Sequence, residues 1–117
     1  MIQTTYPHFI DISPRNALWI SRLRRRFLSC AVIGALVRAF DRVRAWADTQ
    51  RRPIFLGEFG TYEKVPMAPR TRWMSRVARV AEAHGFSWAY WQMDTDFAVY
   101  DFERDAWIAP LVKALVP

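Results

Sequence analysis

Apolar positions along the chain follow a helical period in three places. From residue 31 to residue 48, apolar side chains recur every three or four residues, which is typical of a helix with one buried face. The same spacing runs from Pro69 to about His84, and Gly85 is a natural end for that helix. A third, shorter helix is expected near Pro110, where proline suits a first turn.

Two short apolar runs, residues 54–58 and 86–91, have the composition and length of strands. The expected order is therefore helix, strand, helix, strand, helix. Strands separated by a helix of this length normally pair in parallel, so the pattern predicts an α/β unit. A doubly wound sheet and a barrel both fit this order.

Alternation within the two strands predicts which side chains face the helices. Trp88 and Tyr90 would pack under the helices, and Trp91 would lie at the rim of the other face. In the first strand, Leu56 and Glu58 would share one face. A carboxylate is costly to bury without partners, so Glu58 at the strand end is expected to face a ligand or, alternatively, solvent.

Two motifs occur in sequence, PIFLGEFG at residues 53–60 and SWAYW at residues 87–91, and Val99-Tyr100-Asp101 follows them. Together they resemble the C-terminal part of glycoside hydrolase family 5, the cellulase family. The resemblance implies a partial (β/α)8 TIM barrel with parallel strands, of which this chain holds the last two or three strand–helix units. Residues 40–117 would be that C-terminal fragment, and residues 1–39 form a basic segment that matches nothing recognised.

The resemblance also implies roles for individual residues. Glu58 would be the catalytic nucleophile, and Trp91 would be the aromatic floor beneath the sugar. Gln92 stands where the family usually has glutamate and is a candidate substrate contact. Tyr6 and His8 are candidates for the tyrosine and histidine that the family places near its nucleophile.

The chemistry that the resemblance implies is incomplete in this sequence. The acid/base of the family is a glutamate that follows an asparagine, but Asn16, the single asparagine, is followed by Ala17. We therefore expect a fragment of a retaining glycoside hydrolase acting on β-1,4-glucan in polysaccharide catabolism, inactive when isolated and in need of the missing barrel part. The alternatives are a non-catalytic carbohydrate-binding remnant and a β-mannanase-like fragment.

Charge and composition limit the classes of binding partner that we expect. The net charge is +6, but the arginines are not interleaved with an aromatic platform, and we expect no nucleic-acid partner. The apolar run at residues 27–37 is too short to span a bilayer and does not form a signal peptide, so we expect no membrane partner and leave the localisation open. Cys30 is the single cysteine, which excludes an intrachain disulfide. We expect no cofactor or metal.

Overall fold

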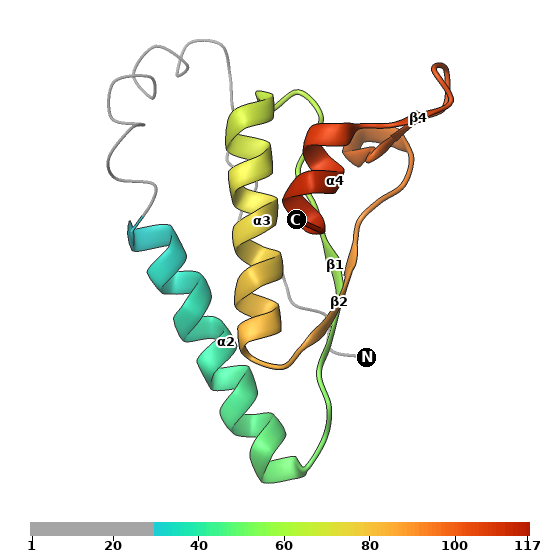
Figure 1. Cartoon of the computed structure of the whole chain (residues 1–117). Helices are drawn as coiled ribbons and strands as arrows, with labels where there is room; N and C mark the ends of the chain where they lie inside the picture. Colours follow the sequence, from blue (N-terminus) through green and yellow to red (C-terminus); the bar gives the residue numbers. More distant parts are fainter. Residues whose placement is uncertain (1–29) are drawn as a thin grey trace. The chain divides into compact units, whose positions relative to one another are not determined.

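The computed structural model describes residues 30–117, which form an α/β unit (Figure 1). Its elements are, in chain order, α2 (Cys30–Gln50), β1 (Phe55–Phe59), α3 (Met67–Ala83), β2 (Ser87–Tyr90), η1 (Thr95–Phe97), β3 (Tyr100–Asp101), β4 (Ala106–Trp107) and α4 (Ala109–Leu115). The three expected helices and two expected strands are confirmed, with ends shifted by one or two residues. None of the described helices combines the length and apolar character needed to cross a membrane.

The segment between β2 and α4 is more ordered than expected. Residues 94–105, with one short apolar piece at 97–100, predict a loop, whereas the structure has the 3-10 turn η1 and the antiparallel hairpin β3–β4. Asp101 accounts for the turn of this hairpin, because its carboxylate accepts hydrogen bonds from the backbone N–H groups of Glu103 and Arg104, at 3.1 and 3.0 Å. In such a turn, the side-chain oxygen of an aspartate takes the place of a backbone carbonyl as the hydrogen-bond acceptor.

β1 and β2 pair in parallel, as expected, but their register contains a bulge. Leu56 lies opposite Trp88 and Phe59 lies opposite Tyr90, so three steps along β1 match two steps along β2. A bulge of this kind changes the face on which the following residue lies. The expectation that Leu56 and Glu58 share a face is therefore wrong.

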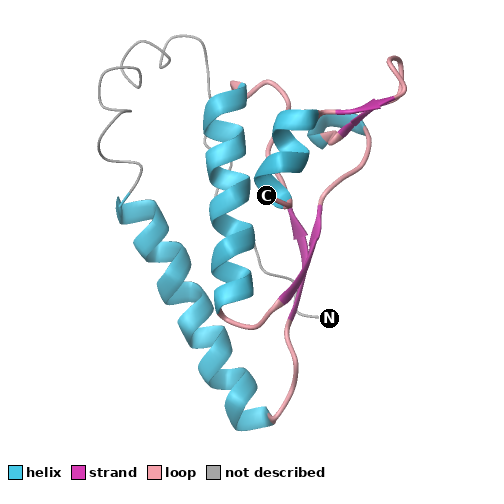
Figure 2. Ribbon diagram, viewed as in Figure 1, coloured by secondary structure: helices cyan, strands magenta, loops and turns pink. Residues whose placement is uncertain are grey.

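Helices α3 and α4 lie beside the strand pair (Figure 2), and the hydrophobic core of the described residues lies between these elements. Its buried residues come from β1, α3, the segment before β3, and α4: Phe59, Met74, Val77, Ala78, Val99, Leu111 and Leu115. Leu56, Trp88 and Tyr90 pack against this cluster, which confirms that Trp88 and Tyr90 face the helices. Met74 on α3 and Leu111 on α4 are fully buried, so the contact between these two helices excludes solvent completely at these positions.

A charged contact joins α2 to the C-terminal end of α3. His84 Nε2 lies 2.9 Å from a carboxylate oxygen of Asp41, and Arg44 donates a hydrogen bond of 3.0 Å to the carbonyl of His84. The bond to Asp41, with a smaller contribution from the carbonyl of Val80, raises the pKa of His84 above its usual value. The ring also meets Phe40 edge to face, with centroids 5.8 Å apart.

The raised pKa of His84 predicts a pH-dependent contribution to stability. The folded chain holds the imidazolium proton to higher pH than the unfolded chain, so this stabilisation is present at low pH and is lost as the pH rises through the raised pKa. Asp41→Asn should therefore lower the free energy of unfolding by under about 1 kcal/mol near pH 5.5 and by less near pH 8. Urea unfolding followed by circular dichroism at both pH values measures the difference.

Asp48→Asn on the same helix is the matched control. Asp48 pairs with Arg44 at 2.9 Å, and arginine stays charged over the whole range, so its effect should be the same at both pH values. If Asp41→Asn lowered the free energy of unfolding equally at both pH values, the contact between Asp41 and His84 would not be ionic.

Candidate functional site

Glu58 lies in the bulge of β1, next to the end of the strand. The residue after it, Phe59, is buried in the core that faces α3, whereas Glu58 is exposed. Because Phe59 is buried against α3 and Glu58 is exposed beside it, the carboxylate of Glu58 faces away from the helices. Among the described residues, the structure records no hydrogen bond or ion pair to this carboxylate. Glu58 is therefore open to a ligand from outside.

Trp91 directly follows β2 and lies beside the end of β1. Its N–H donates a hydrogen bond of 2.8 Å to the carbonyl of Phe59, which continues the pairing of the two strands. Its side chain remains 45% exposed, and the peptide bond to Gln92 is cis. Because parallel strands end at the same edge, the structure brings Glu58 and Trp91 to neighbouring positions at one end of the strand pair.

Gly60 makes this approach of the two strand ends feasible. A Cβ atom at Gly60 would lie 1.9 Å from the carbonyl oxygen of Trp91 and 3.2 Å from the ring of Phe97. The first distance is far below a van der Waals contact, so only glycine fits without a backbone shift. At Gly57 a Cβ would find its nearest neighbour, the ring of Phe55, at 3.6 Å, which is an ordinary contact.

Of the three other site residues expected from the sequence, the structure describes one. Gln92 is half-buried in the turn after Trp91, and its amide donates a hydrogen bond to the hydroxyl of Thr95. Its role as a substrate contact stays a prediction. Tyr6 and His8 lie outside the described residues, so their roles also stay predictions.

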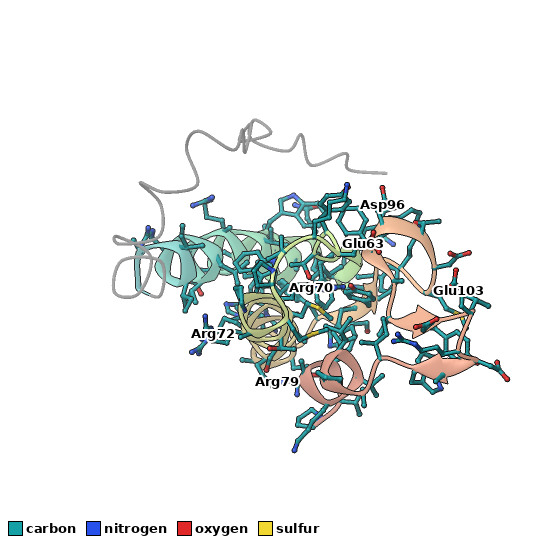
Figure 3. The ribbon with its side chains drawn as sticks, turned by 90° about the horizontal axis from the view of Figure 1, so that it is seen from above. Glu63, Arg70, Arg72, Arg79, Asp96 and Glu103 are labelled. Atoms are coloured by element: carbon teal, nitrogen blue, oxygen red, sulfur yellow. The ribbon has the colours of Figure 1, made fainter. Side chains whose placement is uncertain are left out.

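Arg70 is a residue that the sequence did not single out. It belongs to α3 and is 4% exposed, and its guanidinium donates hydrogen bonds of 3.4 Å to the carbonyls of Glu63 and Ala98. Figure 3 shows Arg70 pointing from α3 toward these loops, whereas Arg72 points away. The arginines of this helix fall mostly off its apolar face in the sequence, and no pattern there distinguishes the buried one.

A further bond joins the loop after β1 to the loop after β2. The N–H of Glu63 donates a hydrogen bond of 2.7 Å to the carbonyl of Asp96. The hydroxyl of Tyr90, at the end of β2, donates a hydrogen bond of 2.7 Å to the carbonyl of Phe97 and so ties the loop after β2 to its own strand. With Arg70 beneath them, the two loops therefore form one connected frame around the ends of the strands. Within residues 30–117, no three histidine, cysteine or acidic side chains are grouped in a way that could hold a metal ion.

The comparisons with known proteins agree with this arrangement of strand ends. A family model described as "Cellulase (glycosyl hydrolase family 5)" matches residues 20–96, which is more than half of the chain. The chain belongs to glycosyl hydrolase family 5. The match includes both Glu58 and Trp91, and it begins well before residue 40. The division of the chain at residues 39 and 40 stays a prediction.

Individual family 5 proteins show the same relationship. The chain is 27% identical over 86 residues to Endoglucanase H of Acetivibrio thermocellus. A solved hyperthermophilic endo-β-1,4-glucanase in complex with substrate is 42% identical with a TM-score of 0.69, and the match covers 73% of this chain. Cel5A of Thermotoga maritima, solved with cellobiose, is 32% identical with a TM-score of 0.74 over 92% of this chain, and it has also been solved with mannotriose.

The chain spans only part of each of these family 5 relatives. It matches 10% of Endoglucanase H, 28% of the hyperthermophilic endo-β-1,4-glucanase and 34% of Cel5A.

The Gly60 geometry yields a direct test of the site. Gly60→Ala should force the Trp91 carbonyl away and lower the free energy of unfolding by about 1–3 kcal/mol, the usual cost of overpacking. Gly57→Ala, three residues earlier and within β1, is the matched control and should change stability by much less. Chemical unfolding of both variants measures the difference. Equal losses would mean that the close approach of Gly60 and Trp91 does not hold in solution.

Proposed function

We propose that this chain supplies the nucleophile-bearing part of a retaining endo-β-1,4-glucanase. The observation that carries the proposal is the bulge in β1, which turns Glu58 away from the helix-packed core at the strand end where Trp91 also lies. Membership of glycosyl hydrolase family 5 supports the same assignment. A free carboxylate beside an exposed indole is a suitable pairing for attack on a bound sugar, because an aromatic ring offers a flat apolar surface.

The proposed fold is the last part of a (β/α)8 barrel, with β1 and β2 as neighbouring strands. Catalytic groups in such barrels come from the C-terminal ends of strands, where Glu58 and Trp91 are found. The face of β1 that carries Glu58 would then point into the barrel. Phe55 is 65% exposed in the described structure, and the other strands of the complete barrel would cover it.

The proposed reaction has two steps. Glu58 attacks the anomeric carbon and displaces the leaving group, which forms a covalent glycosyl-enzyme, and water then hydrolyses that intermediate. Trp91 would hold the reacting sugar by stacking. Such a mechanism needs a second carboxyl group about 5–5.5 Å from the nucleophile, to act as acid and then as base. Since the sequence has no Asn-Glu pair, we propose that this second group comes from another part of the barrel.

The proposed substrate is a β-1,4-glucan, because the relatives include endo-β-1,4-glucanases. A β-mannan is the second candidate substrate, because Cel5A has been solved with mannotriose as well as with cellobiose. A non-catalytic sugar-binding role is the alternative function, and the missing acid/base favours it for the isolated chain. In that case Trp91 would still bind sugar, but Glu58 would have no reaction to perform.

The isolated chain should hydrolyse soluble β-glucan very slowly or not at all. Positioned proton transfer contributes about 10²–10⁴-fold to such reactions, and this chain lacks the group that would supply it. A reducing-sugar assay on purified protein measures the rate. Turnover that disappears in Glu58→Gln would contradict the prediction by showing that the chain contains its own acid/base.

Joining residues 40–117 to the front part of a related complete barrel should restore hydrolysis. Activity of this chimera should fall by about 10³-fold or more in Glu58→Gln, because a neutral amide cannot attack the anomeric carbon. A mechanism-based fluoro-sugar should label Glu58, as peptide mass spectrometry would show. Trp91→Ala should raise KM through loss of the stacking surface.

Glu82→Gln is the matched carboxylate control in the chimera. Glu82 is exposed near the C-terminal end of α3, which leads into the start of β2 and so lies at the opposite end of the strand pair from Glu58 and Trp91; its replacement should leave activity unchanged. Labelling of a different carboxylate would mean that Glu58 is not the nucleophile.

A further inference from the structure

A second polar region lies at the end of the strand pair opposite Glu58. It is a hollow of about 320 Å³ between the end of α2, the start of β1 and the turn that leads into β2. Its lining residues are Arg44, Ala47, Asp48, Arg51, Arg52, Pro53, Ile54, Gly85 and Phe86. Because β1 and β2 are parallel, their N-terminal ends meet here, far from the ends that carry Glu58 and Trp91.

The charge of this hollow is positive. Three of its lining residues are arginines and one is an aspartate, so the lining carries a net charge of 3 − 1 = +2. Arg44 is already committed: it pairs with Asp48 at 2.9 and 3.1 Å and donates to the carbonyl of His84 at 3.0 Å. Asp48 therefore neutralises Arg44 and holds it in place, which leaves the charges of Arg51 and Arg52 uncompensated.

Arg51 and Arg52 have no recorded partners within residues 30–117, where the structure shows no side-chain hydrogen bond or ion pair for either guanidinium. Arginine presents a planar fork of donors that matches the oxygens of phosphate or carboxylate. Arg51 and Arg52 are both exposed, so these two forks on consecutive residues can reach an anion that enters the hollow from solvent, while Ile54 and Phe86 border the hollow on its apolar side.

The backbone at Arg51 adds a second, independent observation. Its φ is 51°, in the left-handed region that favours glycine. The N–H of Arg52 donates to the carbonyl of Ala47 at 3.0 Å, and the N–H of Arg51 donates to the carbonyl of Asp48 at 3.3 Å. This is the Schellman pattern that ends α2, and the residue at the position of Arg51 is usually glycine.

The Schellman bonds also remove an obstacle to anion binding. The C-terminal end of a helix carries partial negative charge on its free carbonyls, which would repel an anion. Here the carbonyls of Ala47 and Asp48 each accept a hydrogen bond from a backbone N–H, so they repel a nearby anion less strongly. An arginine therefore occupies a position that would be easier for glycine, and its guanidinium borders a positively charged hollow.

We propose that this hollow is a binding site for a tetrahedral oxyanion, a phosphate group, held by Arg51 and Arg52 against the wall formed by Arg44. The site lies at the opposite end of the strands from Glu58, so the proposal does not rest on the glucanase function. The bound group can come from free inorganic phosphate or from a phosphate monoester, which share the recognised oxygens.

Equilibrium dialysis of radiolabelled inorganic phosphate against the full 117-residue chain tests the proposal, with the ionic strength held constant by chloride. The expected result is saturable binding that is at least about tenfold weaker in Arg51→Gly and in Arg52→Gln, because each loses a charge-assisted contact. Arg76→Gln is the matched control, since Arg76 is exposed on α3 and does not line the hollow. It removes the same charge and should bind phosphate like the wild type.

Arg51→Gly separates binding from folding. Glycine suits the φ of this position, so far-UV circular dichroism and the unfolding midpoint in chloride should be retained or improved while phosphate binding is lost. Competition by methyl phosphate would extend the site to phosphate monoesters, and a lack of competition would restrict it to the free anion. Absence of saturable binding in the wild type, unchanged binding in both hollow variants, or an equal loss in Arg76→Gln would each overturn the proposal.

Discussion

The bulge in β1 is the feature on which the rest of the described structure depends. Leu56 and Phe59 must both reach the core against α3, yet they stand three residues apart, and an unbroken strand would turn one of them outward. The extra step at Gly57 and Glu58 solves this conflict. It buries both apolar side chains and leaves the carboxylate of Glu58 on the opposite face, where it does not lose its hydration to the core.

The frame around this bulge is built mainly from backbone groups. The carbonyl of Phe59 accepts from Trp91, the carbonyl of Asp96 accepts from Glu63, and Gly60 allows the Trp91 carbonyl to approach. Backbone contacts of this kind position neighbouring side chains without using them, which leaves Glu58 and Trp91 free for a ligand. Their backbone positions are thus set by the pairing of the strands.

Arg70 shows how α3 contributes to the same frame. Its buried guanidinium meets two carbonyls and no carboxylate among the described residues, and its Nε has no partner there. A charge buried with neutral partners is less well compensated than one in an ion pair, so Arg70 adds order to the loops more than it adds stability. The parallel strand pair therefore has two chemically different ends: a frame with an open carboxylate at one, and unpaired arginines at the other.

The sequence by itself determined the three helices, the two parallel strands and the family. Helical periods define α2 and α3, apolar runs define β1 and β2, and the helix between the two strands favours their parallel pairing. Each of these is a local property, because it depends on residues close together in the chain. The motifs around Glu58 and Trp91 are local in the same sense, and they were sufficient to identify glycosyl hydrolase family 5.

Only the tertiary structure decided which way the side chains point and which of them meet. Strict alternation misplaces Leu56 relative to Glu58, because a bulge arises from competition for the core and leaves no local pattern. The burial of Arg70 and the contact between His84 and Asp41 join residues far apart in sequence, and their neighbours in the chain do not distinguish them. The physical reason is the same in each case: packing selects among conformations that local propensities leave nearly equal.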